Sequence, residues 1–70
     1  SKVKEESIHN KVIVEEALKK LNEKERAVII LRYFEDEKLE DITRIMEMPL
    51  STTKSILYRA LNKMKLDLKE

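Results

Sequence analysis

The side chains best suited to chemistry gather near the end of the chain, and they are hydrogen-bond donors rather than nucleophiles or metal ligands. Cations, hydroxyls, a phenol and an amide recur there at Thr52, Thr53, Lys54, Ser55, Tyr58, Arg59, Asn62 and Lys63. Lysine and arginine neutralise phosphates, a guanidinium donates in a fork to guanine, and a small hydroxyl adapts to either group. The pattern predicts a surface that binds the backbone and base edges of a nucleic acid.

Helical spacing arranges these side chains around one outer face. At about 100° per residue, the positions outside the apolar stripe are Ser55, Arg59 and Asn62 at the centre, Lys54 and Tyr58 on one shoulder, and Ile56 and Lys63 on the other. Thr52 and Thr53 stand at the expected helix N-terminus, where hydroxyls and free amides favour a backbone phosphate. The candidate DNA contacts therefore extend along about the first two thirds of this helix.

The same residues have simpler interpretations. Exposed lysines near a helix C-terminus are usually solvated or offset the helix dipole, and this applies to Lys63, Lys65 and Lys69. Tyr58 suits half-buried packing as well as it suits a sugar or a thymine methyl. Lys54 and Arg59 are the stronger candidates for contact because they lie inside the segment expected to bind bases.

Residues for catalysis or metal binding are sparse. The chain has no cysteine, no glycine and one histidine, His9, on a polar stretch near its start. Five acids cluster in mid-chain, at Glu35, Asp36, Glu37, Glu40 and Asp41. They lack the alternating ligand spacing and the glycine of a calcium loop, so a solvated acidic face is the simpler interpretation. We expect no enzyme activity, no metal and no other cofactor.

Composition favours a single small all-α domain. The 70 residues are too few for two cores, and 41% charged with 41% hydrophobic residues suits amphipathic helices. Sheet proteins usually need glycine at tight turns, and here glycine is absent and proline occurs once, at Pro49. The longest apolar run, 27–31, is too short to span a bilayer, so no membrane partner is expected. The absence of cysteine is compatible with a reducing cytoplasm.

The net charge of +1 conceals an uneven distribution. Residues 50–70 hold five bases and two acids, whereas 35–49 hold six acids and two bases. The basic end is the natural side to face phosphate.

Apolar spacing predicts four helices. The first covers about 7–20. The second begins at Asn22, which with Glu25 has capping-box spacing, and it buries Ala27, Val28, Ile30, Leu31 and Phe34. The third covers about 39–47 with a stripe of Leu39, Ile42, Ile45 and Met46, and Pro49 stops it. The fourth is capped by Ser51, continues to about 68, and turns Leu57, Ala60, Leu61, Met64 and Leu68 inward.

The last two helices form a helix-turn-helix over about 39–66. A short amphipathic helix, a turn of about four residues and a basic amphipathic helix make up this layout. The first helix braces the second, and the second lies in the major groove with its N-terminal part on base edges.

Two stretches resemble region 4 of the bacterial sigma-70 family, most closely the extracytoplasmic-function group. LNEKERAVIILRYF at 21–34 and LEDITRIMEMPLSTTKSILYRALNKMK at 39–65 carry the likeness. The matching positions are Leu21, Arg26, Leu31, Arg32, Tyr33, Phe34, Asp41, Ile42, Pro49, Thr52, Lys54, Ser55, Leu57, Arg59 and Ala60. Together they cover about 17–66.

The resemblance implies that the domain binds the −35 promoter element as double-stranded DNA. Lys54, Ser55, Tyr58 and Arg59 occupy positions where family members touch DNA, with Thr52 near phosphate. RNA polymerase, through the flap of its β subunit, is the implied protein partner, and an anti-sigma factor is a further one. We expect a cytoplasmic monomer that is a fragment of a longer chain.

The chain departs from the family pattern at six positions. They are Asn22 for a proline, Thr43 for an alanine, Glu47 and Ser51 for glycines, Thr53 for a valine and Ile56 for an arginine. Without glycine at Glu47, the turn must close on a less flexible residue or take a different type. Ile56 removes a charge that often serves phosphate.

Two other hypotheses remain besides the sigma domain. One is a helical protein-interaction module that kept the fold and lost tight DNA binding, as the low net charge and Ile56 suggest. The other is a different helix-turn-helix regulator that binds paired half-sites as a dimer.

Overall fold

A computed structural model describes the backbone of residues 13–69 and the side chains of residues 13–64. Residues 13–18 are helical, and four labelled elements follow: α2 (Glu23–Ile29), the π-helix η1 (Ile30–Phe34), α3 (Leu39–Met46) and α4 (Leu50–Lys69). No strand occurs in this part of the chain, so the predicted all-α fold is confirmed. The start of the first predicted helix, 7–12, lies outside the described residues, and so does His9.

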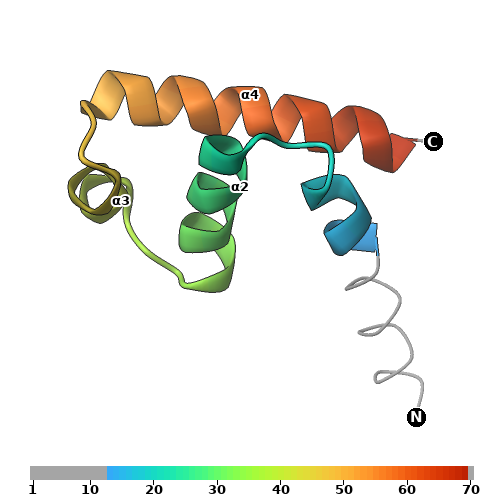
Figure 1. The fold of residues 1–70 in the computed structure, drawn as a ribbon, viewed down its shortest axis with the longest axis horizontal. Helices are drawn as coiled ribbons and strands as arrows, with labels where there is room; N and C mark the ends of the chain where they lie inside the picture. Colours follow the sequence, from blue (N-terminus) through green and yellow to red (C-terminus); the bar gives the residue numbers. More distant parts are fainter. Residues whose placement is uncertain (1–12, 70) are drawn as a thin grey trace, which may run out of the picture.

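The long helix α4 organises the molecule (Figure 1). Helix α2 stands against its middle, α3 lies near its N-terminal end, and residues 13–18 lie toward its C-terminal half. Among the labelled elements, α2 makes the most extensive contact with α4, and α3 packs against both α4 and η1. None of the described helices combines the length and apolarity needed to cross a bilayer.

The core forms where these elements meet. Its buried members are Leu18, Leu21, Val28, Ile29, Ile42, Ile56, Leu57 and Ala60. The predicted inward positions Val28, Ile42, Leu57 and Ala60 are confirmed. Two other predictions are wrong: Phe34 is 57% exposed, and Ile45 faces solvent as well.

Two polar residues explain why the predicted stripes were displaced around their helices. In α2 the buried set is Glu25, Val28 and Ile29, and in α4 it includes Thr53 one turn before Ile56 and Leu57. Both sets follow the i, i+3, i+4 spacing of a helix face. Because a stripe inferred from apolar residues alone omits Glu25 and Thr53, it is rotated away from the true buried face.

The predicted capping box at the start of α2 is confirmed. The amide of Glu25 donates to Asn22 Oδ1 at 2.8 Å, and the amide of Asn22 donates to Glu25 Oε1 at 2.9 Å. Arg26 ties the preceding segment to this turn by donating to the carbonyls of Leu18 and Leu21, at 3.1 and 2.8 Å. These bonds fix the direction in which the chain enters α2.

The second helix ends as a π-helix. The amide of Glu35 donates to the carbonyl of Ile30 at 2.9 Å, a bond across five residues, and Arg32 donates to the carbonyl of Glu37 at 3.1 Å. The wider turn changes the angular spacing of side chains. Phe34, which a 3.6-residue repeat would turn inward, therefore faces solvent.

The turn of the helix-turn-helix closes without glycine. Glu47 adopts the left-handed conformation, with φ 55° and ψ 52°. The amide of Met48 donates to Thr43 O at 3.1 Å, and the amide of Glu47 donates to Arg44 O at 3.3 Å. These two bonds form a Schellman motif, in which glycine is the usual left-handed residue. Glu47 thus adopts the left-handed conformation that glycine, the family's usual residue at this position, would adopt.

Helix α4 begins two residues earlier than predicted, at Leu50 rather than after Ser51. The carbonyl of Pro49 accepts the first helical bond, from the amide of Thr53 at 3.0 Å. Ser51 therefore lies inside the first turn, and its predicted role as the N-cap is wrong. Proline suits this position because its missing amide has no partner to lose at a helix start.

We predict that Glu47→Gly stabilises the domain. A left-handed non-glycine residue costs about 1–2 kcal/mol, and the extra freedom of glycine in the unfolded chain offsets about 0.5–1 kcal/mol of that. The free energy of unfolding, measured by urea titration, should rise by about 0.5–1 kcal/mol. Asp36→Gly is the matched control and should increase stability less. Asp36 also has a positive φ of 59°, but aspartate tolerates this conformation better than glutamate does. A lower stability for Glu47→Gly would contradict this account of the turn.

Candidate nucleic-acid interface

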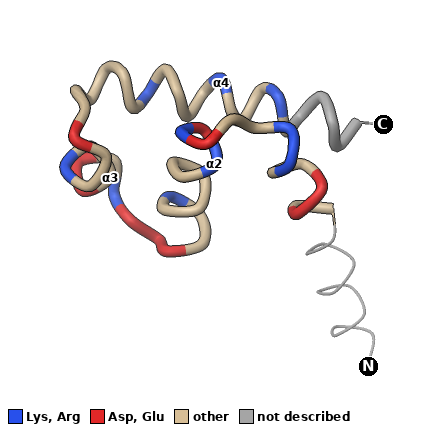
Figure 2. Tube along the Cα trace, viewed as in Figure 1, with Lys and Arg blue, Asp and Glu red and all other residues tan. Residues whose placement is uncertain are grey.

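Over residues 50–64, one side of α4 is exposed and free of carboxylates. Between Leu50 and Met64 the helix carries Lys54, Arg59 and Lys63 and no acid (Figure 2). The exposed side chains of this stretch are Leu50, Ser51, Thr52, Lys54, Ser55, Tyr58, Arg59 and Asn62. The structure therefore brings six of the eight predicted contact residues to solvent on one helix, with Tyr58 61% exposed.

Thr53 does not belong to this surface. Its side chain is 0% exposed, and its hydroxyl donates to the carbonyl of Pro49 at 3.2 Å. In this conformation the side chain cannot reach DNA, so we remove Thr53 from the predicted contacts. It instead ties the first turn of α4 to the end of the preceding loop.

Ile56 also lies elsewhere than predicted. It was placed on the outer shoulder of the helix, but it is buried in the core beside Leu57. An arginine at this position would have to leave the core to meet phosphate. Isoleucine in place of the family's usual arginine therefore removes a charge from the outer surface and adds a buried apolar side chain where α2 meets α4.

Lys63 is partly engaged inside the protein. Its Nζ donates to Glu25 Oε1 at 2.9 Å, and its side chain is 41% exposed. The solvated lysine considered from the sequence thus has a specific partner on α2. Since this bond uses its charge, Lys63 is a weaker candidate for phosphate than Lys54.

Glu25 is the most unusual charged residue of the described structure. It is 1% exposed, and Oε1 accepts both from Lys63 and from the amide of Asn22. The hydrogen bond from Lys63 and then the backbone bond from Asn22 lower the pKa of Glu25 from its ordinary value of 4.5. Burial acts in the opposite direction, and the charges of Lys63 and Arg59 lower the pKa further. The carboxylate is therefore held ionised inside the domain.

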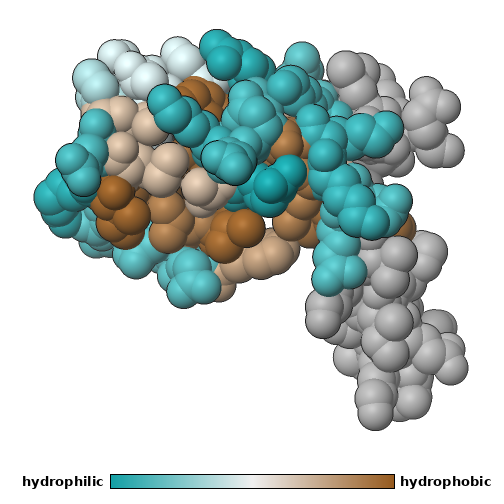
Figure 3. All heavy atoms as spheres, viewed as in Figure 1, coloured by the Kyte–Doolittle hydropathy of each residue, from teal (hydrophilic) through white to brown (hydrophobic). Residues whose placement is uncertain are grey.

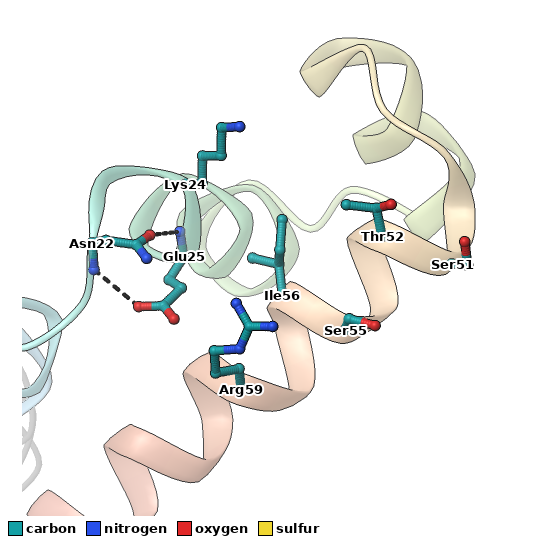
Figure 4. A pocket seen from close by; sticks show the side chains of 8 residues that line it. All are labelled: Asn22, Lys24, Glu25, Ser51, Thr52, Ser55, Ile56 and Arg59. Carbon is teal, nitrogen blue, oxygen red and sulfur yellow. Dashed lines mark hydrogen bonds between the residues drawn. The ribbon is translucent and has the colours of Figure 1, made fainter.

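A pocket of about 380 Å³ lies between the first turn of α2 and the exposed face of α4 (Figure 4). Its lining residues are Asn22, Lys24, Glu25, Ser51, Thr52, Ser55, Ile56 and Arg59. Arg59 reaches from α4 toward Glu25, whereas Lys24 extends away from it. The pocket thus joins three predicted contact residues, Thr52, Ser55 and Arg59, to the N-terminus of α2.

Reasoning from the sequence missed Lys24, Glu25 and Ser51 as neighbours of this surface. Glu25 was assigned to the capping box, but its burial was not foreseen. The signal was present, because Glu25 precedes Val28 and Ile29 by three and four residues. No comparable signal in the sequence places Lys24 beside α4.

Several large apolar side chains are exposed on the described part of the molecule. The large ones besides Tyr58 are Tyr33, Phe34, Ile45 and Leu50. Figure 3 shows apolar side chains below α4, between α3 and α2, bordered by hydrophilic ones. Within the described residues, no cluster of three or more histidine, cysteine or carboxylate side chains could hold a metal ion.

Comparison with known families identifies the domain. A family model described as sigma-70, region 4, matches residues 17–66, most of the chain. The chain belongs to the sigma-70 region 4 family. This region 4 domain is also 47% identical, over 53 residues, to the RNA polymerase sigma factor SigV of Bacillus subtilis (strain 168).

That alignment covers 76% of this chain and 32% of the Bacillus protein, so the chain spans about a third of its relative. No solved structure matches the chain. The family assignment confirms the resemblance inferred from 21–34 and 39–65, and a sigma factor relative agrees with the expected group.

We predict that Lys63→Met destabilises the region 4 domain by leaving a buried carboxylate without its cation. Breaking such a pair costs about 3–5 kcal/mol when both partners are buried. Lys63 is 41% exposed, so we expect about 1–3 kcal/mol in a urea titration. Lys54→Met, at an exposed position, should change stability by less than about 0.5 kcal/mol. Adding Glu25→Gln should recover most of the loss, and equal losses for the two lysine variants would exclude this role of Lys63.

The lowered pKa of Glu25 also predicts that the stability of the domain depends on pH in the acidic range. A carboxyl whose pKa is lowered by folding contributes its full stabilisation above its unfolded pKa, near 4.5. That contribution is lost as the pH falls through the lowered folded value. Thermal melts between pH 7 and pH 2 should therefore fall less steeply for Glu25→Gln than for the wild type below about pH 4.5. Parallel curves would mean that folding does not lower the pKa of Glu25.

Proposed function

We propose that this domain binds double-stranded promoter DNA at the −35 element, as region 4 of a cytoplasmic sigma factor that directs RNA polymerase to initiate transcription. The observation that carries the proposal is the exposed face of α4, the second helix of a helix-turn-helix, which is free of acids over residues 50–64. Such a helix lies in the major groove and presents its N-terminal residues to base edges. Membership of the sigma-70 region 4 family supports the same function.

The exposed residues divide into two roles. Thr52, in the first turn of α4, and Lys54 contact phosphates and fix the helix in the groove. Ser55, Tyr58 and Arg59 follow at positions that meet base edges, with the guanidinium of Arg59 suited to guanine. Asn62 lies one turn beyond Tyr58 and donates or accepts at the edge of the same site. Lys63 joins the DNA contacts only at the expense of its bond to Glu25.

A second function, contact with RNA polymerase, is favoured by the exposed apolar side chains. Tyr33 and Phe34 end the π-helix, and Ile45 faces solvent from α3. Figure 3 also shows apolar side chains gathered below α4, and such patches mark protein interaction sites. We propose that the polymerase β flap occupies this surface and that an anti-sigma factor competes for it. The domain works as a monomer, which separates it from a dimeric regulator with paired half-sites.

The central test is selection of duplexes from a random library, followed by fluorescence anisotropy on the selected sequence. We expect one short non-palindromic motif. Arg59→Ala should weaken binding to it by about 1–3 kcal/mol and relax the preference at one base pair. Lys19→Ala removes an equal charge from an exposed site off α4 and should preserve the preference. Recovery of no motif would leave polymerase binding as the favoured function.

Lys54 is expected to contact phosphate rather than bases. Lys54→Ala should weaken binding to the selected and the scrambled duplex equally, because a phosphate carries no sequence information. It should also reduce the slope of log Kd against log salt by about 1, the effect of one phosphate contact. A loss confined to the selected duplex would instead assign Lys54 to a base.

A further inference from the structure

One oxygen of the buried carboxylate has no hydrogen-bond partner. Glu25 Oε1 accepts two bonds, whereas Oε2 accepts none among the described residues and lies out of solvent. A buried acceptor without a donor is costly, and more so when it is charged. The structure therefore supplies an acceptor for a donor that can enter the pocket beside it.

Arg59 is the side chain best placed to supply that donor. It lines the same pocket as Glu25, and its guanidinium extends from α4 toward α2 (Figure 4). Its charge helps to lower the pKa of Glu25, which places it within electrostatic range. Lys24, the other cation of the pocket, extends away from the carboxylate, and Lys63 is already bound to Oε1.

We propose that Glu25 is a positioning residue for DNA recognition, with Oε2 accepting a hydrogen bond from Arg59 and so directing its remaining donors toward the major groove. The inference rests on the proposed function, in which Arg59 contacts a base. A guanidinium has five donors in a planar fork, so one edge can bind the carboxylate while another binds DNA. No new bond to DNA is required of Glu25 itself.

The benefit to binding is preorganisation. An arginine that is free in solution loses rotamer freedom when it binds a base, whereas one already held by a carboxylate loses less. The lysine on Oε1 balances the negative charge of Glu25. Arg59 can therefore be held by Glu25 and still present net positive charge to the groove.

The first experiment needs no DNA. In the 70-residue chain at pH 7, the NMR signal of the Arg59 Nε–Hε group should show restricted motion and slow exchange with water. Glu25→Gln should release it, because an amide accepts more weakly than a carboxylate, while glutamine still serves the capping box. Glu23→Gln, an equal change of charge at an exposed site in the same turn, should leave the signal unchanged. Free motion of Arg59 in the wild type would overturn the proposal without reference to any variant.

The second experiment measures discrimination, the ratio of Kd for a scrambled duplex to Kd for the selected one. Glu25→Gln should lower this ratio about threefold to tenfold, the equivalent of ordering one long side chain. In an Arg59→Ala background it should lower the ratio no further. Glu23→Gln should not change it, and circular dichroism should show that each variant is folded.

The outcomes separate the inference from the function on which it rests. If Arg59→Ala has no effect on binding to the selected duplex, Arg59 does not contact a base, and the proposed role of Glu25 in DNA recognition fails with it. The NMR measurement of Arg59 motion then still tests whether Glu25 holds Arg59. If Arg59→Ala weakens binding but Glu25→Gln preserves the ratio, the inference fails while the function stands. If Glu25→Gln lowers the ratio equally with and without Arg59, Glu25 acts through Lys63 or the fold, and the inference fails.

Discussion

The carboxylate of Glu25 lies where the first turn of α2 meets α4, and several features of the domain depend on it. Through Oε1 it closes the capping box with Asn22 and binds Lys63 from α4. One side chain therefore fixes both the start of α2 and its position along α4. Removing a carboxylate from water is expensive, and the two donors on Oε1 offset that cost. The bonds of Glu25 therefore fix how α2 is positioned along α4, which nondirectional packing of the small apolar core alone would not do.

The exposed face of α4 follows from what the helix buries. Thr53, Ile56, Leu57 and Ala60 occupy its inner side, at the spacing of one helix face. The complementary positions Lys54, Ser55, Tyr58 and Arg59 must then face solvent. The proposed DNA surface is thus set by the core. Of the polar groups in the buried stripes, the Thr53 hydroxyl and Glu25 Oε1 are hydrogen-bonded, whereas Glu25 Oε2 has no partner.

Much of this architecture could be predicted from local signals. Asn22 and Glu25 predicted the capping box, Pro49 predicted the end of α3, and the polar positions of α4 predicted most of the exposed face. The errors at Glu25 and Phe34 share a physical origin, because they occur where hydrophobicity and burial disagree. Glu25 is charged and buried, and Phe34 is apolar and exposed. The burial of Glu25 depends on a lysine 38 residues away, and the exposure of Phe34 depends on a π-helix. The periodicity of apolar residues in the sequence reveals neither of these features.

The distribution of charge decides how such a domain can bind DNA with a net charge of only +1. The acids of 35–47 precede α4, and Lys63 is engaged by Glu25. Over residues 50–64, the exposed face of α4 then holds Lys54 and Arg59, with Lys24 across the pocket. The two or three cations of this described surface release few counterions, so they supply little affinity that is independent of sequence. Under the proposed function, specific binding then depends on well-ordered base contacts and on affinity contributed by polymerase. When nonspecific attraction is weak, little free energy is available to offset the rotamer entropy that an arginine loses on binding a base. Holding Arg59 in place before DNA binds, as we propose for Glu25, would then increase affinity most.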